Sequence, residues 1–181
     1  MRALFGVTTT IALVGAVSAP ALAQQSLHSQ LEGVWKITAD YDQFTDGHKR
    51  NTMGNNPQGM AVFTPSGTFI FELMSGDRSA KSGTGPVDPV GPAIAFFATY
   101  TVDEQNKTYT YDVQQCTFPQ WNGISRTTTV TDISPTSFKI VAATIHDLER
   151  GDFQPHLEFE RAGGNVMKRR RLGHLEISNL A

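Results

Sequence analysis

Hydrophobic and polar residues alternate along several stretches of this chain, which is the period of a β-strand with one buried face. In residues 31–39 (LEGVWKITA), one side of such a strand carries Gly33, Trp35, Ile37 and Ala39, and the other carries Val34, Lys36 and Thr38. The same two-residue period recurs as far as residue 161 and excludes a helical bundle.

Residues 58–64 and 68–74 form the clearest predicted hairpin, joined by the turn TPSG. Pro65 presets φ for the first corner of this turn, and Gly67 supplies the positive φ that closes it. The second strand, TFIFELM, places its aromatic residues on one face only. We therefore expect that face to be packed.

The other expected strands follow at similar intervals and are joined mostly by short turns. They cover residues 92–102 (after an initial helical turn), 108–114, 124–132, 137–145 and 154–161. About eight to ten such strands predict an all-β chain that forms a single antiparallel up-and-down β-barrel, because closure removes the exposed edges of an open sheet. A β-sandwich is the alternative that the period alone does not exclude.

Two longer polar segments interrupt the strands. Residues 40–56 contain the turn signals Asp46-Gly47 and Asn55-Asn56, and they predict a hairpin or long loop over one barrel mouth, with a short second strand at most. Residues 75–91 are rich in Gly, Ser and Pro, without periodicity. Loops of this length usually have a function, so this excursion is either a lid or a disordered insertion.

The first 23 residues resemble a secretory signal peptide, with Arg2, an apolar run and small residues at Ala21 and Ala23. The run is shorter than the roughly 20 residues of a membrane-spanning helix. We expect cleavage after Ala23, a lead-in over residues 24–30, one barrel domain over 31–161 and a C-terminal tail over 162–181. The expected location is periplasmic or secreted, without stable membrane insertion after cleavage.

Charge and cysteine content narrow the possible partners. Without residues 1–23 the chain has 14 Lys and Arg against 17 Asp and Glu, a net charge of about −3. This mild balance argues against a nucleic-acid partner. Cys116 is the single cysteine, so an intrachain disulfide is impossible and stability depends on packing and closure of the barrel.

The order of several short motifs resembles the bacterial and fungal lipocalin-like domain family across most of residues 31–161. The family pattern has an early G-x-W, a P-x-G before a T-P-x-G hairpin, a Y-x-V-D strand, and a late P-x-W-x-G followed by Arg. The matching residues here are Gly33 and Trp35; Pro57, Gly59, Thr64, Pro65 and Gly67; Tyr100, Val102 and Asp103; and Pro119, Trp121, Gly123 and Arg126. One departure is Ala98, where the family usually has Gly.

The resemblance implies a small lipocalin-like barrel with an apolar interior, and it transfers no catalytic residues. It implies that Trp35 plugs the closed end of the barrel after Gly33. It also implies that an arginine stacks across the Trp35 ring, for which Arg126 and Arg161 are the candidates.

Aromatic residues recur on one face of several expected strands and are candidates for lining a ligand cavity. A barrel of about eight strands can enclose one small ligand, although ordinary core packing is the alternative for each residue. The candidates are Phe63, Phe69, Phe71, Phe96, Phe97, Tyr100, Tyr109, Tyr111, Trp121 and Phe138.

Candidates for acid–base catalysis are His48, His146, Asp112 and Glu72, each on condition that the side chain points into the barrel. A surface role is the alternative for all four. The histidines lack metal-ligand spacing, and the chain contains no nucleophile elbow, P-loop or dinucleotide fingerprint. We therefore expect no metal and no cofactor.

The leading hypothesis is a protein that binds a small apolar molecule inside the barrel. The alternatives are a small-molecule isomerase or cyclase that uses the same cavity, and a structural or interaction module whose barrel is filled with side chains. The sequence leaves the ligand, the oligomeric state and the role of the basic tail residues 168–171 open.

Overall fold

The computed structural model of the chain describes residues 25–78 and 91–163. The expected signal peptide, most of the 75–91 excursion and nearly all of the C-terminal tail lie outside these residues. Within them, no helix has both the length and the apolar character needed to cross a membrane.

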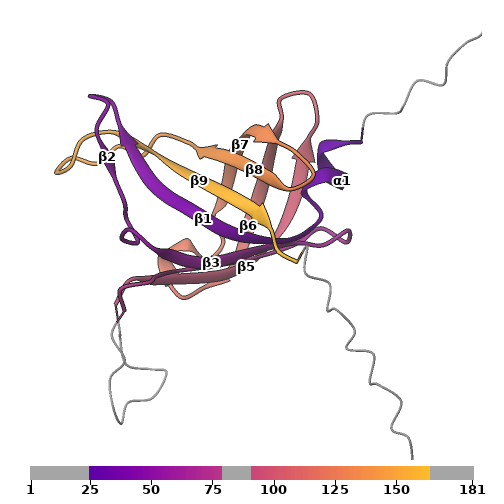
Figure 1. The fold of residues 1–181 in the computed structure, drawn as a ribbon, viewed down its shortest axis with the longest axis horizontal. Helices are drawn as coiled ribbons and strands as arrows, with labels where there is room; N and C mark the ends of the chain where they lie inside the picture. The colour runs from indigo at the N-terminus through magenta and orange to yellow at the C-terminus, as the bar shows by residue number, and fades with distance from the viewer. Residues whose placement is uncertain (1–24, 79–90, 164–181) are drawn as a thin grey trace, which may run out of the picture.

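Nine antiparallel strands follow one another around the sheet in the order β2-β1-β3-β4-β5-β6-β7-β8-β9. The strand β1 also pairs with β9, so eight strands close into a barrel and the short β2 lies beside β1 (Figure 1). The predicted all-β up-and-down barrel is confirmed. The strands are β1 (Gly33–Phe44), β2 (Lys49–Arg50), β3 (Pro57–Phe63), β4 (Thr68–Ser75), β5 (Ala93–Asp103), β6 (Thr108–Cys116), β7 (Ser125–Ile133), β8 (Ser137–Ala142) and β9 (Phe153–Arg161).

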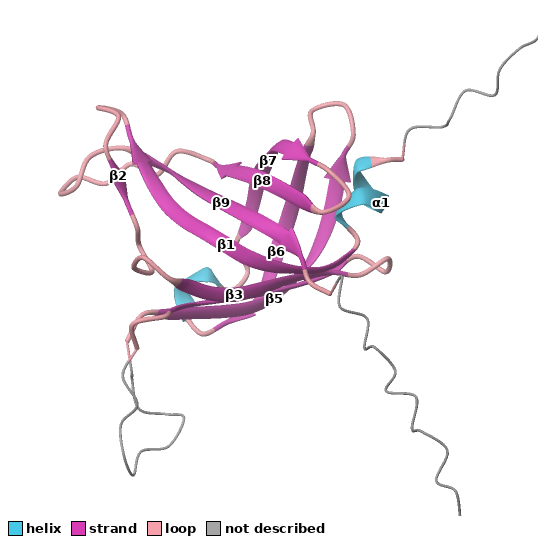
Figure 2. Ribbon diagram, viewed as in Figure 1, coloured by secondary structure: helices cyan, strands magenta, loops and turns pink. Residues whose placement is uncertain are grey.

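Two short helices accompany the barrel, α1 (Leu27–Leu31) and the 3-10 turn η1 (Pro119–Trp121), both drawn in cyan in Figure 2. The helix α1 lies at the end of the barrel opposite the β1–β2 turn (Figure 1). Its backbone N–H groups at Leu27 and His28 donate to the carboxylate of Glu104, at 2.6 and 3.0 Å. This contact fixes α1 to the β5–β6 turn as a cover for that end.

Several predicted boundaries were wrong at this level of detail. Leu31 ends α1 instead of opening the first strand, and Gly91 and Pro92, the described residues directly before β5, form a bend instead of a helical turn. Of the hairpin or loop expected over residues 40–56, the hairpin with a short second strand is confirmed as β1–β2. The first strand is longer than expected, because β1 continues to Phe44 and pairs with β9 from Trp35 to that residue. A strand pairing of this extent outweighs the local preference of a polar segment for a loop.

A β-bulge changes which residues of β1 face the interior. The register with β9 shifts between Ile37 and Ala39, so that Trp35 and Ile37 are buried before the bulge and Asp42 and Phe44 after it. Ala39 was expected on the Trp35 side, but the extra residue turns the even-numbered positions inward.

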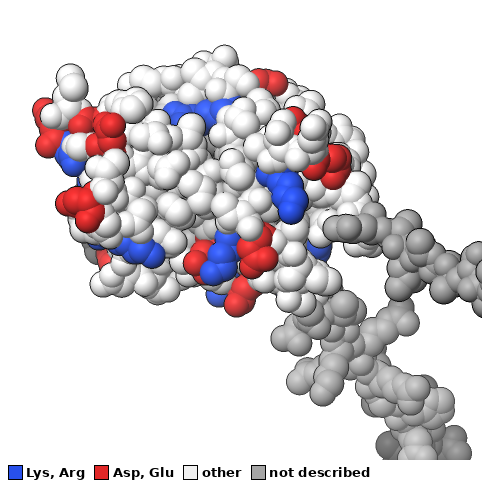
Figure 3. Space-filling view, turned by 90° about the horizontal axis from the view of Figure 1, so that it is seen from above, with Lys and Arg blue, Asp and Glu red and all other residues white. Residues whose placement is uncertain are grey.

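The alternation predicted for the second strand of the hairpin is confirmed in β4. Phe69, Phe71 and Leu73 are buried, whereas Ile70 and Glu72 are exposed. On the outer face seen in Figure 3, acidic and basic side chains lie in small, separate groups with uncharged residues between them.

Candidate functional site

A cavity of about 430 Å³ occupies the barrel between its packed end and the mouth near β2 and η1. Its walls are mainly apolar and aromatic. The aromatic lining consists of Phe69, Phe71, Phe96, Tyr109, Tyr111, Phe118, Trp121 and Phe153. Leu73, Ile94, Ile140 and Leu157 are among the aliphatic lining residues. The volume lies within the range of about 300–1,000 Å³ that is typical of small-molecule sites.

The opposite end of the barrel is closed around Trp35. The indole is fully buried, its Nε1 donates to the Leu31 carbonyl at 2.7 Å, and its ring meets the edge of Phe138. The Arg161 guanidinium lies over the same ring, with its central carbon 4.0 Å from the ring centroid. Arg161 also donates to three backbone carbonyls, those of Gln30, Glu32 and Pro135.

This arrangement explains the glycine of the G-x-W motif. A Cβ at Gly33 would lie 2.6 Å from Nη1 of Arg161, and the residue has a φ of +123°, which side chains other than glycine rarely tolerate. The glycine thus leaves room for the arginine that covers Trp35.

Two carboxylates from β1 project into the cavity below its mouth. Asp42 is 5% exposed. It forms an ion pair with Arg50 at 2.6 Å and accepts a hydrogen bond from the Thr52 hydroxyl at 2.7 Å. In Asp40, by contrast, the Oδ2 atom is buried without a hydrogen-bond partner. Burial, followed by the charge of Asp42, raises the pKa of Asp40 to about 6, although the Met53 backbone N–H opposes that rise.

A basic and aromatic group lies on the β6–β7 side of the cavity. Arg126 of β7 is paired across the strands with Tyr111 of β6, and its guanidinium carbon is 4.0 Å from the centroid of Trp121 in η1. Trp121 in turn meets the edge of Phe96. Burial raises the pKa of Tyr111 to about 12, while the charge of Arg126 acts in the opposite direction. The Tyr111 hydroxyl is therefore a hydrogen-bond donor at neutral pH.

The predicted aromatic residues separate into three groups. Six of them line the cavity: Phe69, Phe71, Phe96, Tyr109, Tyr111 and Trp121. Phe63, Tyr100 and Phe138 are buried but lie outside the cavity lining, in the packed core. Phe97 is 45% exposed, because its neighbours Phe96 and Ala98 are the inward residues of β5.

The four candidates for acid–base chemistry do not line the cavity. Glu72 and Asp112 are exposed at outward positions of β4 and β6. His48 and His146 are exposed and pair with Asp46 and Asp152, respectively. The condition attached to these residues, an inward side chain, is not met.

The inward carboxylates Asp40 and Asp42 were missed by sequence reasoning. The available signal was the alternation D-Y-D-Q-F in residues 40–44, which continues the strand period. It was assigned to a hairpin or long loop because the whole segment is polar and contains turn signals. Within the described residues, no cluster of three or more His, Cys, Asp or Glu side chains forms a metal-binding group.

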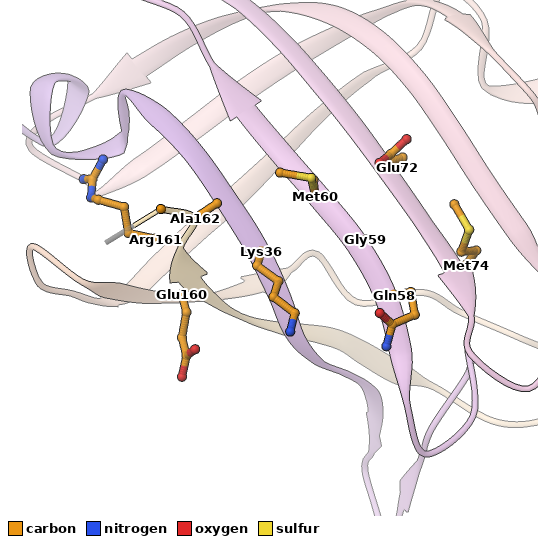
Figure 4. A pocket seen from close by; sticks show the side chains of 10 residues that line it. Lys36, Gln58, Gly59, Met60, Glu72, Met74, Glu160, Arg161 and Ala162 are labelled. Carbon is orange, nitrogen blue, oxygen red and sulfur yellow. The ribbon is translucent and has the colours of Figure 1, made fainter. Parts of the chain in front are cut away.

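A second hollow lies outside the barrel, on β1, β3 and β4 (Figure 4). Its volume is about 560 Å³, and Lys36, Met60, Glu72 and Glu160 contribute to its lining. Because it is an open groove with charged side chains of both signs, an apolar molecule would lose less water-exposed surface there than inside the barrel.

Comparisons with known proteins found similar solved structures and a matching family model. A redesigned β-barrel has 17% identity, with a TM-score of 0.37, over 76% of this chain and 96% of the other. Bovine odorant binding protein, solved in complex with a selenium-containing odorant, has 16% identity and a TM-score of 0.41 over 81% and 78%. Among curated proteins, none matches this sequence. The family model described as lipocalin-like domain matches residues 32–134, more than half of the sequence, and the chain belongs to that family.

Proposed function

We propose that this protein binds a small, mostly apolar molecule inside its barrel. The observation that carries the proposal is the 430 Å³ cavity with aromatic walls, which opens at one end and is closed by Trp35 and α1 at the other. Apolar surface moved from water into such a cavity contributes roughly 25 cal/mol per Å². A filled barrel would leave no such space.

The adjacent residues Phe96 and Phe97 provide a matched test. Phe96 lines the cavity and is 6% exposed, whereas Phe97 points outward from the same strand. We expect Phe96→Ser to weaken binding of the neutral dye N-phenyl-1-naphthylamine at least tenfold and Phe97→Ser to change it less than twofold, measured by fluorescence titration. Equal effects of the two substitutions, or no dye uptake by the unaltered protein, would contradict the proposal.

The natural ligand is best sought by native mass spectrometry of the protein purified gently from its own source. A reproducible added mass that organic extraction removes would support a carrier function. The same preparation tests the proposed export, because the sequence predicts a mature chain that begins after Ala23 and is recovered from the periplasm or medium.

One observation favours a second candidate, an isomerase or cyclase that uses the cavity. The Asp40 carboxylate has a buried oxygen without a partner, and its pKa of about 6 suits proton exchange near neutral pH. If the extracted molecule is converted into an isomer on incubation with the protein, Asp40→Asn should abolish the conversion and retain binding. Conversion at an unchanged rate would exclude Asp40 as the acid or base.

A further inference from the structure

The cavity lining contains an arginine, Arg126, with a polar atom that lacks a partner. The Arg126 Nε is buried without a hydrogen-bond partner, and no carboxylate in residues 25–78 or 91–163 forms an ion pair with this side chain. Its guanidinium carbon lies over the Trp121 ring, 4.0 Å from the ring centroid.

The other arginines near the interior differ in this respect. Arg50 pairs with Asp42, Arg150 pairs with Asp147, and Arg161 donates to three carbonyls. A buried N–H group without a hydrogen-bond acceptor is costly. Among the arginines of the cavity, Arg126 is therefore the one that would gain most from an anion that comes from outside the chain.

The shape of the site indicates the kind of anion. The Trp121 ring lies against the Arg126 guanidinium, so a ligand in the cavity would meet the N–H groups that the ring does not cover. A carboxylate matches two parallel N–H donors of arginine in this way. Tyr111 lies directly across the strands from Arg126 and offers a hydroxyl as a further donor.

The remaining walls restrict the rest of the molecule. Phe69, Phe71 and Phe96 surround an apolar space, and an apolar body would occupy it without leaving polar groups unpaired. On β1, Asp40 adds an acidic group to the lining and Asp42 already holds Arg50, so neither offers a site for a second negative group. The complementary ligand thus has one anionic end and an apolar body.

We propose that Arg126, with Tyr111, binds the carboxylate of an apolar monocarboxylic acid whose body fills the barrel. This inference rests on the proposed function, since it assumes that the cavity takes up a ligand. It assigns the ligand's chemical class and names the residues that select it.

The test compares decanoate with 1-decanol at pH 7.5 as competitors of N-phenyl-1-naphthylamine. The two have the same chain length and differ in the charged group. We expect the unaltered protein to bind decanoate at least tenfold more tightly than 1-decanol, and Arg126→Gln to lose that preference while 1-decanol binding changes less than twofold. Retained 1-decanol binding would also show that the variant is folded.

Arg150→Gln is the matched control, because Arg150 also lines the cavity but already has Asp147 as a partner. It is expected to retain the preference for decanoate. Equal binding of acid and alcohol by the unaltered protein, or an equal loss of preference in both variants, would overturn the assignment of Arg126. Dye uptake without preference for the acid would overturn this inference alone, whereas absence of any uptake would overturn the proposed function as well.

Discussion

The buried carboxylate of Asp40 lowers the stability of the fold and adds a polar group to the cavity. Its carboxylate lies in the barrel next to Asp42 and opposite Leu157 of β9, with one oxygen that has no partner. Burial raises its pKa from 3.8 to about 6, which means that the folded protein prefers the protonated form. Residues with a pKa shifted in this way are common at functional sites.

The Asp40 carboxyl predicts a pH-dependent stability. Because the folded-state pKa is raised, its contribution is fully present below about pH 4 and is lost as the pH rises through about 6. We expect Asp40→Asn to raise the free energy of unfolding more at pH 8 than at pH 4. The difference between the two pH values should be at most about 3 kcal/mol, since one pKa unit corresponds to about 1.4 kcal/mol. Urea denaturation at both pH values measures this difference.

Asp112→Asn provides the control, because it removes a carboxylate from an exposed position on the outer face. The comparison of the two variants therefore isolates the effect of the buried position of Asp40. A gain for Asp40→Asn that does not change with pH would rule out the ionised carboxylate as its cause.

At the scale of elements, the closed end is a joint product of α1, β1 and β9. The α1 carbonyls of Gln30 and Leu31 accept hydrogen bonds from Arg161 and Trp35, respectively. The β1–β9 pairing places Arg161 directly beside Trp35. The neighbouring segments α1 and β1 thus meet β9, which follows more than a hundred residues later, on one indole ring, so loss of that ring should loosen all three.

Trp35→Ala is therefore expected to destabilise the fold by about 3–5 kcal/mol, the range for removing a large buried aromatic side chain. Trp121→Ala removes the same side chain from the half-buried position at the mouth and should cost clearly less. Urea unfolding of both variants measures the difference. Equal losses would contradict the assignment of Trp35 as the plug.

At the scale of the whole molecule, closure and cavity are linked. The β1–β9 pairing joins the first and last barrel strands, so the residues that line the cavity belong to one cooperative unit. Anything that binds only the closed form should stabilise the entire barrel.

The neutral dye N-phenyl-1-naphthylamine at one hundred times its Kd should raise stability by about 2.7 kcal/mol. For a domain of this size that corresponds to a Tm increase of roughly 5–10 °C, measurable by circular dichroism. Phe96→Ser at the same dye concentration should show a smaller increase. A Tm independent of dye concentration would place the dye outside the folded barrel.

Much of the architecture was predictable from the sequence because it depends on local rules. Alternation in TFIFELM specified a strand with one buried face, and TPSG specified the turn before it. Repetition of such units, with closure as the means of removing edges, predicted the barrel. The order of motifs around Gly33, Trp35 and Trp121 pointed to the family that the match over residues 32–134 shows.

The contents of the barrel were decided by the tertiary structure. Alternation places Phe69 and Phe63 equally inward, but only the packing of the whole barrel determines that Phe69 lines the cavity while Phe63 belongs to the packed core. The bulge after Ile37, defined by pairing with β9 more than a hundred residues later, turned Asp40 inward. Side-chain direction in a sheet follows the strand register, and the register is set by partners distant in sequence. The sequence alone therefore determined the barrel, whereas the tertiary structure determined which side chains face its interior.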